Sequence, residues 1–168
     1  MDKKVIKLNT IAHFKGDYID DNKEPAKERR HLSIEKEEES NYLFFIKLTS
    51  QKRKELNQVR LKLKIEPDSV ECLNKVSYPV FNRKVQISLT DLETTNYQHF
   101  YVCALHLVGC LKPEKFAEIC QRFKKLWEDE STPKSEKKTI LLKASELKPT
   151  DEIPWWVNYT SKDRKQRK

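Results

Sequence analysis

The strictest pattern in the chain is an alternation of apolar and charged residues over positions 59–66, which read Val-Arg-Leu-Lys-Leu-Lys-Ile-Glu. Successive side chains of a β-strand point to opposite faces. As a strand, this segment therefore places its four apolar residues on one face and Arg60, Lys62 and Lys64 on the other. The pattern predicts an amphipathic strand with a basic face, which ends at Pro67.

Other segments also favour strands. Residues 42–48 read Tyr-Leu-Phe-Phe-Ile-Lys-Leu, a short aromatic and apolar run that is typical of a buried strand. Residues 84–89 repeat the apolar–polar alternation, with Arg83 at their entrance. We expect shorter strands at residues 139–142 and 5–8.

The clearest helix signal lies at residues 113–129. Pro113 suits the first helical position, and Glu114 suits the positive end of the helix dipole. Apolar residues recur at helical spacing and are expected to form one stripe that packs on a sheet: Phe116, Ile119, Cys120, Phe123, Leu126 and Trp127.

Residues 97–111 admit two interpretations. Positions 100–108 form a near-continuous run of β-formers, whereas Thr90 and Glu93 have the spacing of a helix capping box. We favour the strand. The alternative treats residues 91–129 as two helices joined by a turn, which has the outline of a helix-turn-helix.

The order of these elements predicts an α+β fold: a small antiparallel β-sheet or barrel, OB-like or PH-like in architecture, packed by one C-terminal amphipathic helix. Residues 1–40 are expected to hold a short strand and a flexible charged connector, whose only ordered candidate is residues 31–35. The globular β-rich core should span residues 41–145, with its helix at 113–129. Residues 146–168 would form a Pro- and Trp-containing docking segment with a basic tail.

Composition excludes several classes of site and protein. The chain has only two glycines, Gly16 and Gly109, so glycine-rich phosphate loops and nucleophile elbows are excluded. No apolar run is long enough to span a bilayer, and no hydrophobic leader follows Met1. We therefore expect a nuclear or cytoplasmic protein with reduced cysteines that is neither secreted nor bound to a membrane.

The 168-residue chain carries a formal net charge of +8, and its positive charge lies in patches. Basic stripes and tails of this kind favour contact with a phosphate backbone, whether of DNA or of RNA. The same residues could instead protect an edge strand from aggregation, or simply be solvated. The candidate nucleic-acid-binding residues are Lys52, Arg53, Lys54, Arg60, Lys62, Lys64, Arg83, Lys84, Arg164, Lys165, Arg167 and Lys168.

Two adjacent tryptophans, Trp155 and Trp156, give the sharpest sign of a protein interface. Adjacent side chains on an extended segment point to opposite sides, so one indole can pack on the chain's own core and the other on a partner. Tryptophan is also enriched at interface hot spots. The candidate partner-binding residues are Ile153, Trp155, Trp156 and Tyr159.

No pattern points to catalysis or to a cofactor. His99, Cys103, His106 and Cys110 have metal-ligand residue types, but on a strand the first two face one side and the last two the other. We expect these four to be core or interface residues, and we expect neither a metal site nor enzymatic activity.

The sequence therefore predicts a non-catalytic accessory subunit of a nucleic-acid-handling complex. Such a subunit binds one or more larger protein subunits through apolar surfaces and contacts DNA or RNA through its basic patches. One alternative is a protein–protein interaction adaptor that does not bind nucleic acid, in which charge serves solubility and acidic partners. Another is a helix-turn-helix-like DNA-binding protein.

Overall fold

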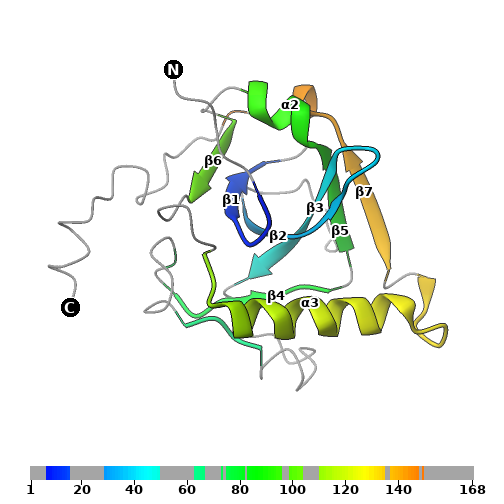
Figure 1. Ribbon diagram of the computed structural model, residues 1–168. Helices are drawn as coiled ribbons and strands as arrows, with labels where there is room; N and C mark the ends of the chain where they lie inside the picture. Colours follow the sequence, from blue (N-terminus) through cyan, green and yellow to red (C-terminus); the bar gives the residue numbers. More distant parts are fainter. Residues whose placement is uncertain are drawn as a thin grey trace, which may run out of the picture.

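The computed structural model describes residues 7–15, 29–49, 63–66, 73, 75–81, 83–95, 99–103, 110–134, 137–147 and 149. These residues form an α+β fold in which seven strands make one mostly antiparallel open sheet and two helices pack against it (Figure 1). The strands are β1 (Ile11–Phe14), β2 (Arg29–Glu37), β3 (Tyr42–Thr49), β4 (Tyr78–Pro79), β5 (Arg83–Ser88), β6 (Phe100–Cys103) and β7 (Lys138–Leu142).

The strand order is β6-β1-β2-β3-β5-β7, with β4 paired to β3 beside this path. Every pairing is antiparallel except that of β5 with β7, which is parallel. A parallel pair needs a crossover connection, and here the chain reaches the opposite edge of the sheet at β6 before it returns to β7.

Alternate side chains of β3 build two separate hydrophobic clusters, which explains why that strand is almost continuously apolar. Phe44 and Ile46 belong to an outer cluster that also contains the buried residues of the long helix. Leu43 and Phe45 belong to an inner cluster on the opposite face of the sheet. Because both faces of β3 are covered, the prediction of a buried strand is confirmed.

The sheet curls around the inner cluster, so its overall form is coarsely that of a small barrel. Phe100 of β6 and Leu142 of β7 lie in this one cluster, although their strands form opposite ends of the strand order. His99 Nδ1 lies 2.9 Å from the carbonyl oxygen of Leu147, which links the start of β6 to the segment that follows β7.

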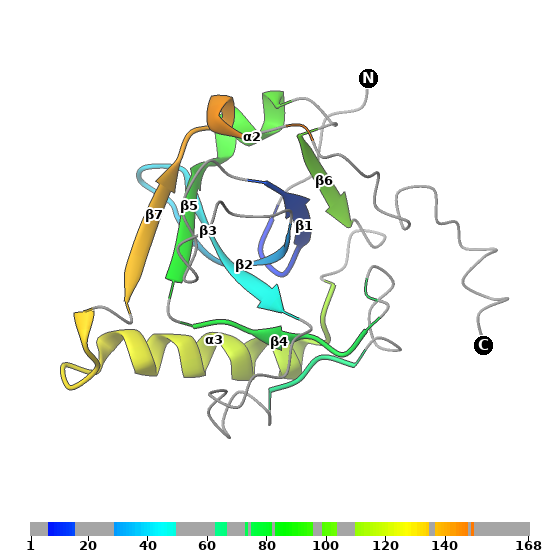
Figure 2. The same cartoon turned by 180° about the vertical axis from the view of Figure 1, so that it is seen from behind.

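The long helix α3 (Pro113–Glu128) packs on the outer cluster through Ile119 and Phe123, which are buried. In Figures 1 and 2, α3 runs across one end of the sheet, while α2 (Leu89–Thr94) and the short 3-10 helix η3 (Ala144–Glu146) lie at the other end. The predicted helix and its stripe are thus confirmed. In the described part of the chain, neither helix is long and apolar enough to cross a bilayer.

The N-terminal strand begins later than the sequence predicts. Leu8 and Asn9 lie in a turn, and the strand starts at Ile11 because Asn9 adopts a left-handed conformation with φ 60°. This conformation turns the chain before β1 begins to pair. The prediction of a strand at residues 5–8 is therefore wrong for residues 7 and 8, and residues 5 and 6 lie outside the described part of the chain.

The charged connector also contains more structure than residues 31–35. Strand β2 covers Arg29–Glu37 and pairs with both β1 and β3. Its charged C-terminal half conceals the strand pattern, and a register shift between Ser33 and Glu35 interrupts the alternation. At Ser33, where the register shift begins, the side-chain hydroxyl accepts a hydrogen bond from Thr10 N at 2.9 Å. The division of the chain into three parts remains a prediction.

Residues 100–103 are a strand, as favoured, and residues 104–109 lie outside the described part. The N-cap of the short α2 is Ser88, two residues before the Thr90 of the proposed capping box, and Ser88 Oγ accepts a hydrogen bond from Asp91 N at 3.5 Å. The Thr90 hydroxyl is instead used by Asn41 Nδ2, which donates to it at 2.7 Å. The two-helix arrangement is wrong because β6 occupies the place of its first helix.

Candidate functional site

Three of the twelve candidate nucleic-acid-binding residues lie in the described part of the chain: Lys64, Arg83 and Lys84. Lys64 Nζ forms an ion pair with Glu66 Oε1 at 3.2 Å, and both side chains are about half exposed. Such surface pairs contribute little to stability. The candidates that lie outside the described residues are Lys52, Arg53, Lys54, Arg60, Lys62, Arg164, Lys165, Arg167 and Lys168.

The alternation predicted for residues 59–66 can be followed only at its end. Leu63 and Ile65 are buried, whereas Lys64 between them is exposed, as the alternation requires. Ile65 forms an isolated antiparallel bridge with Ser77, in which each residue's N–H donates to the other's carbonyl oxygen. Positions 59–62 lie outside the described residues, so the basic strand face stays a prediction.

Lys84 is held against two aromatic rings. Its Nζ lies 4.4 Å from the centroid of Phe44 and 4.8 Å from that of Trp127. Trp127 is fixed in turn, because its indole N–H donates to the Phe81 carbonyl oxygen at 2.7 Å and its ring stacks on Phe123. The Lys84 ammonium therefore joins β3 and β5 to the end of α3 through cation–π contacts.

Four aromatic side chains near the basic segments could by residue type stack on nucleic-acid bases, namely Tyr78, Phe81, Tyr97 and Tyr101. Tyr78, Phe81 and Tyr101 are each 9% exposed or less. A stacking platform must offer a ring face to solvent, so these three residues cannot serve as one. Tyr97 lies outside the described residues.

Strand β7 ends the strand order and has β5 as its only described neighbour. Figure 2 shows it at the margin of the sheet, on the opposite side from β6. Ile140 and Leu142 point to the inner cluster, whereas Leu141 alternates with them and its side chain is 58% exposed. Thr139 is exposed as well. Within the described part of the chain, β7 thus presents both an unpaired edge and an apolar side chain beside it.

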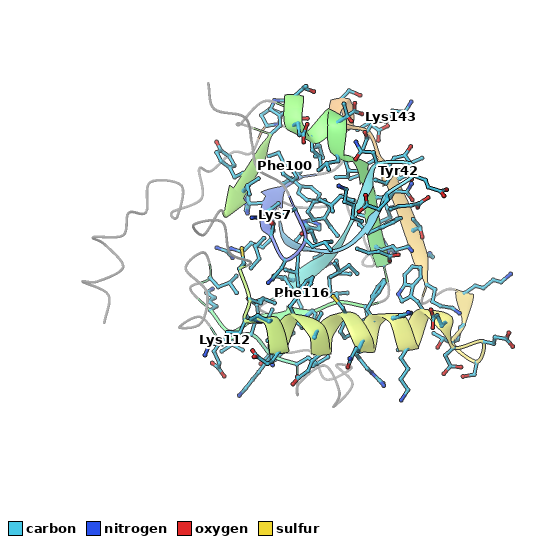
Figure 3. The ribbon with its side chains drawn as sticks, in the orientation of Figure 1. Lys7, Tyr42, Phe100, Lys112, Phe116 and Lys143 are labelled. Atoms are coloured by element: carbon cyan, nitrogen blue, oxygen red, sulfur yellow. The ribbon has the colours of Figure 1, made fainter. Side chains whose placement is uncertain are left out.

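The charged residues of the β5–β7 ladder are all basic. Residues 83–88 and 137–143 contain basic side chains and no acidic ones: Arg83, Lys84, Lys137, Lys138 and Lys143. Lys138 and Lys143 are exposed at the two ends of the strand, and Figure 3 shows Lys143 at the α2 end of β7, at the margin of the sheet. We call the edge of β7 together with Lys138, Leu141 and Lys143 the β7 edge.

Sequence reasoning identified a strand at residues 139–142 but not its position in the sheet. The local signal was the apolar run between lysines, Lys-Lys-Thr-Ile-Leu-Leu-Lys. The predicted partner-binding residues Ile153, Trp155, Trp156 and Tyr159 lie outside the described residues.

The two cysteine side chains that the structure describes, Cys110 and Cys120, are buried or partly buried. Cys110 is buried, and its Sγ accepts a hydrogen bond from Ile11 N at 3.3 Å. Cys120 has its pKa raised to about 11 by burial, with a smaller contribution from the charge of Glu35. A thiol with so high a pKa is a weak nucleophile at neutral pH. The described residues contain no cluster of metal-ligating side chains.

No protein-family model matches the chain, and no curated protein sequence matches it.

Proposed function

We propose that this protein is a non-catalytic accessory subunit of a nucleic-acid-handling complex and that it binds a larger protein. The observation that supports the protein-binding part is the β7 edge. It combines an unpaired strand edge, an exposed leucine and two exposed lysines on the described surface. Natural proteins usually cover or interrupt such edges, and an edge left available is a template for strand addition.

Charge distribution supports the nucleic-acid part of the proposal. Residues 47–64 carry seven basic side chains against Glu55, and residues 162–168 carry five against Asp163. Clusters of this kind release counterions when they meet a phosphate backbone.

A protein adaptor without nucleic-acid binding is the second candidate, and one observation favours it. Lys84 is held on two aromatic rings, and Lys64 pairs with Glu66. Lys84 and Lys64 thus already have intramolecular partners.

Fluorescence anisotropy of the full chain with labelled single-stranded and duplex oligonucleotides tests the nucleic-acid part. We expect affinity to fall steeply as salt rises from about 50 to about 300 mM. Changing Arg60, Lys62 and Lys64 together to Glu should weaken binding and flatten the salt dependence. The control matched in charge changes Lys112, Lys124 and Lys125 to Glu, because these three lysines are exposed at the start and on the surface of α3.

Unchanged affinity in the triple variant, with its circular dichroism intact, would remove the strand-face part of the proposal. If the full chain does not bind the oligonucleotides even at low salt, the adaptor function is favoured. Membership of a complex is tested separately, by the native molecular mass at which the tagged full chain elutes from its own cells. Trp155→Ala with Trp156→Ala should reduce that mass to that of the free chain if the tryptophans bind the partner.

A further inference from the structure

We infer that the β7 edge binds an extended acidic segment of the partner protein, which adds to the sheet as a further strand beside β7. This inference rests on the proposed function that the protein binds a larger protein, and it names the chemistry of the bound segment. An added strand would make β7 an internal strand and extend the order beyond it.

The backbone of β7 sets the conformation of the ligand. The strand is five residues long, or about 16 Å, and its ladder to β5 is parallel over that whole length. In such a ladder alternate backbone groups point toward β5 and the others point away from it. The outward N–H and C=O groups match the groups of another extended chain.

Side chains beside the edge set which residues the ligand needs. Leu141 lies opposite Gln86 in the register and Thr139 lies opposite Lys84, so these four share the outer face. Leu141 is 58% exposed there. An apolar side chain on the added strand would cover Leu141, and residues two positions away would share its face.

Charge sets the sign of the ligand. Lys138 and Lys143 are exposed at the two ends of β7, and residues 83–88 and 137–143 hold five bases and no acid, with Glu136 just before them in the sequence. Opposite charges across neighbouring strands stabilise a pair, whereas like charges destabilise it. A segment that alternates Asp or Glu with apolar residues complements both Leu141 and the lysines.

The same charges disfavour a second copy of this chain. Pairing two β7 strands about a twofold axis brings together two edges that both carry only positive charge. A phosphate backbone would satisfy the lysines, but it cannot pair with the alternating outward backbone groups or cover Leu141. The acidic extended peptide is therefore the occupant that matches all three properties of the edge.

The test uses a displayed library of random peptides of about 12 residues, selected on the full chain. An edge variant carries Lys138→Glu, Leu141→Ser and Lys143→Glu, and the control variant carries Lys112→Glu and Lys124→Glu. We expect selected peptides to alternate acidic and apolar residues. Their affinity should fall at least about tenfold in the edge variant and stay within about twofold in the control.

Hydrogen exchange locates the bound peptide. Outward-pointing amides of β7 should gain protection when a selected peptide binds the full chain, because they then donate to its carbonyl groups. If the edge variant loses its circular dichroism, Lys138→Gln with Lys143→Gln replaces it and should still weaken binding.

Several outcomes would overturn the inference: no enriched peptides, peptides without acidic residues, equal affinity for the edge variant, or protection confined to other strands.

Specific binding of an oligonucleotide that the edge variant alone loses would assign the edge to nucleic acid. A full-chain dimer that the edge variant abolishes would assign it to a second copy. If the β7 amides are protected in the full chain without peptide, and deletion of residues 150–168 removes that protection, the edge binds the C-terminal segment of this chain. In each case, complex membership and salt-dependent oligonucleotide binding, measured separately, decide whether the proposed function itself stands.

Discussion

Asn9 and Leu111 exchange two hydrogen bonds across more than half of the chain. Asn9 Nδ2 donates to the Leu111 carbonyl oxygen at 2.7 Å, and Leu111 N donates to Asn9 Oδ1 at 3.0 Å. The backbone adds a third bond, from Cys110 N to the Asn9 carbonyl oxygen at 2.7 Å. Together these bonds hold the segment before α3 against the turn that precedes β1.

Replacing Asn9 with Ala should lower the free energy of unfolding by about 2 kcal/mol. The change removes both side-chain bonds and leaves the backbone groups of Leu111 without these partners. Urea unfolding followed by circular dichroism measures the loss. Asn41→Ala is a matched control, because Asn41 also has a positive φ (57°) and its exposed side chain donates one bond. An equal loss in the two variants would contradict the role given to Leu111.

Removing the Lys84 ammonium should cost about 1 kcal/mol of stability, because its cation–π contacts join the sheet to α3. Lys84→Met keeps the aliphatic stem and loses the charge. Trp127→Leu removes one of the two rings, and a double-mutant cycle between the two changes measures their coupling by urea unfolding. Lys124→Met, on the exposed surface of α3, is the control. A coupling energy near zero would show that the contacts do not stabilise the fold.

Cys120 should resist alkylation at neutral and mildly alkaline pH. Burial, followed by the Glu35 charge, raises the pKa of its thiol from 9.0 to about 11. The iodoacetamide reaction at Cys120, followed by peptide mass spectrometry, should accelerate only as pH approaches about 11. Glu35→Gln should lower the pKa slightly, because burial is the larger cause. Half-maximal reaction near pH 9.0 in the folded protein would contradict this prediction.

The same thiol makes stability depend on pH. In the unfolded chain it loses its proton near pH 9.0, whereas in the folded chain it keeps the proton until about 11. Between these values the unfolded state binds fewer protons, so stability should fall as pH rises through this window. Comparison of the chain with Cys120→Ala, by urea unfolding at several pH values, isolates this contribution. A parallel pH dependence in both proteins would rule it out.

Asp129, which follows α3, should titrate below its usual range. The Ser131 hydroxyl donates to Asp129 Oδ1 at 2.7 Å, and Ser131 N donates to the same oxygen at 2.9 Å. These bonds are the main cause of the lowered pKa, and the hydroxyl contributes most. Ser131→Ala should therefore raise the pKa of Asp129 toward 3.8, which an NMR titration of the carboxyl group measures. Lys137→Gln should have a smaller effect, since the Lys137 charge is a lesser cause.

Local sequence patterns predicted most of the elements. The apolar run at 42–48, the alternation at 84–89 and the helical stripe at 113–129 each correspond to an element within a residue or two of the predicted bounds. Their signals are periodicities that arise from burying one or both faces. Strand β2 was less visible, because its second half is charged and exposed and its register is interrupted.

Side-chain roles depended on contacts that no local pattern contains. Lys84 has the same place in the sequence alternation as any exposed lysine, yet Trp127 from α3 and Phe44 from β3 hold its ammonium. Tyr78 and Tyr101 are typical base-stacking residues by type but are buried in the fold. For the same reason, the exposed Leu141 cannot be distinguished in the sequence from its buried neighbour Leu142.

The sequence by itself determined that this is an α+β chain with short strands, one long amphipathic helix and positive charge in patches. Those properties follow from side-chain periodicity and charge, which each segment carries locally. Only the tertiary structure decided that β7 pairs with β5 in parallel and ends the sheet. Strand order depends on hydrogen bonds between segments far apart in the chain and on the closure of two hydrophobic clusters. Among the described residues, those long-range contacts leave the outer edge of β7 without a neighbouring strand and thereby select it as the site to test.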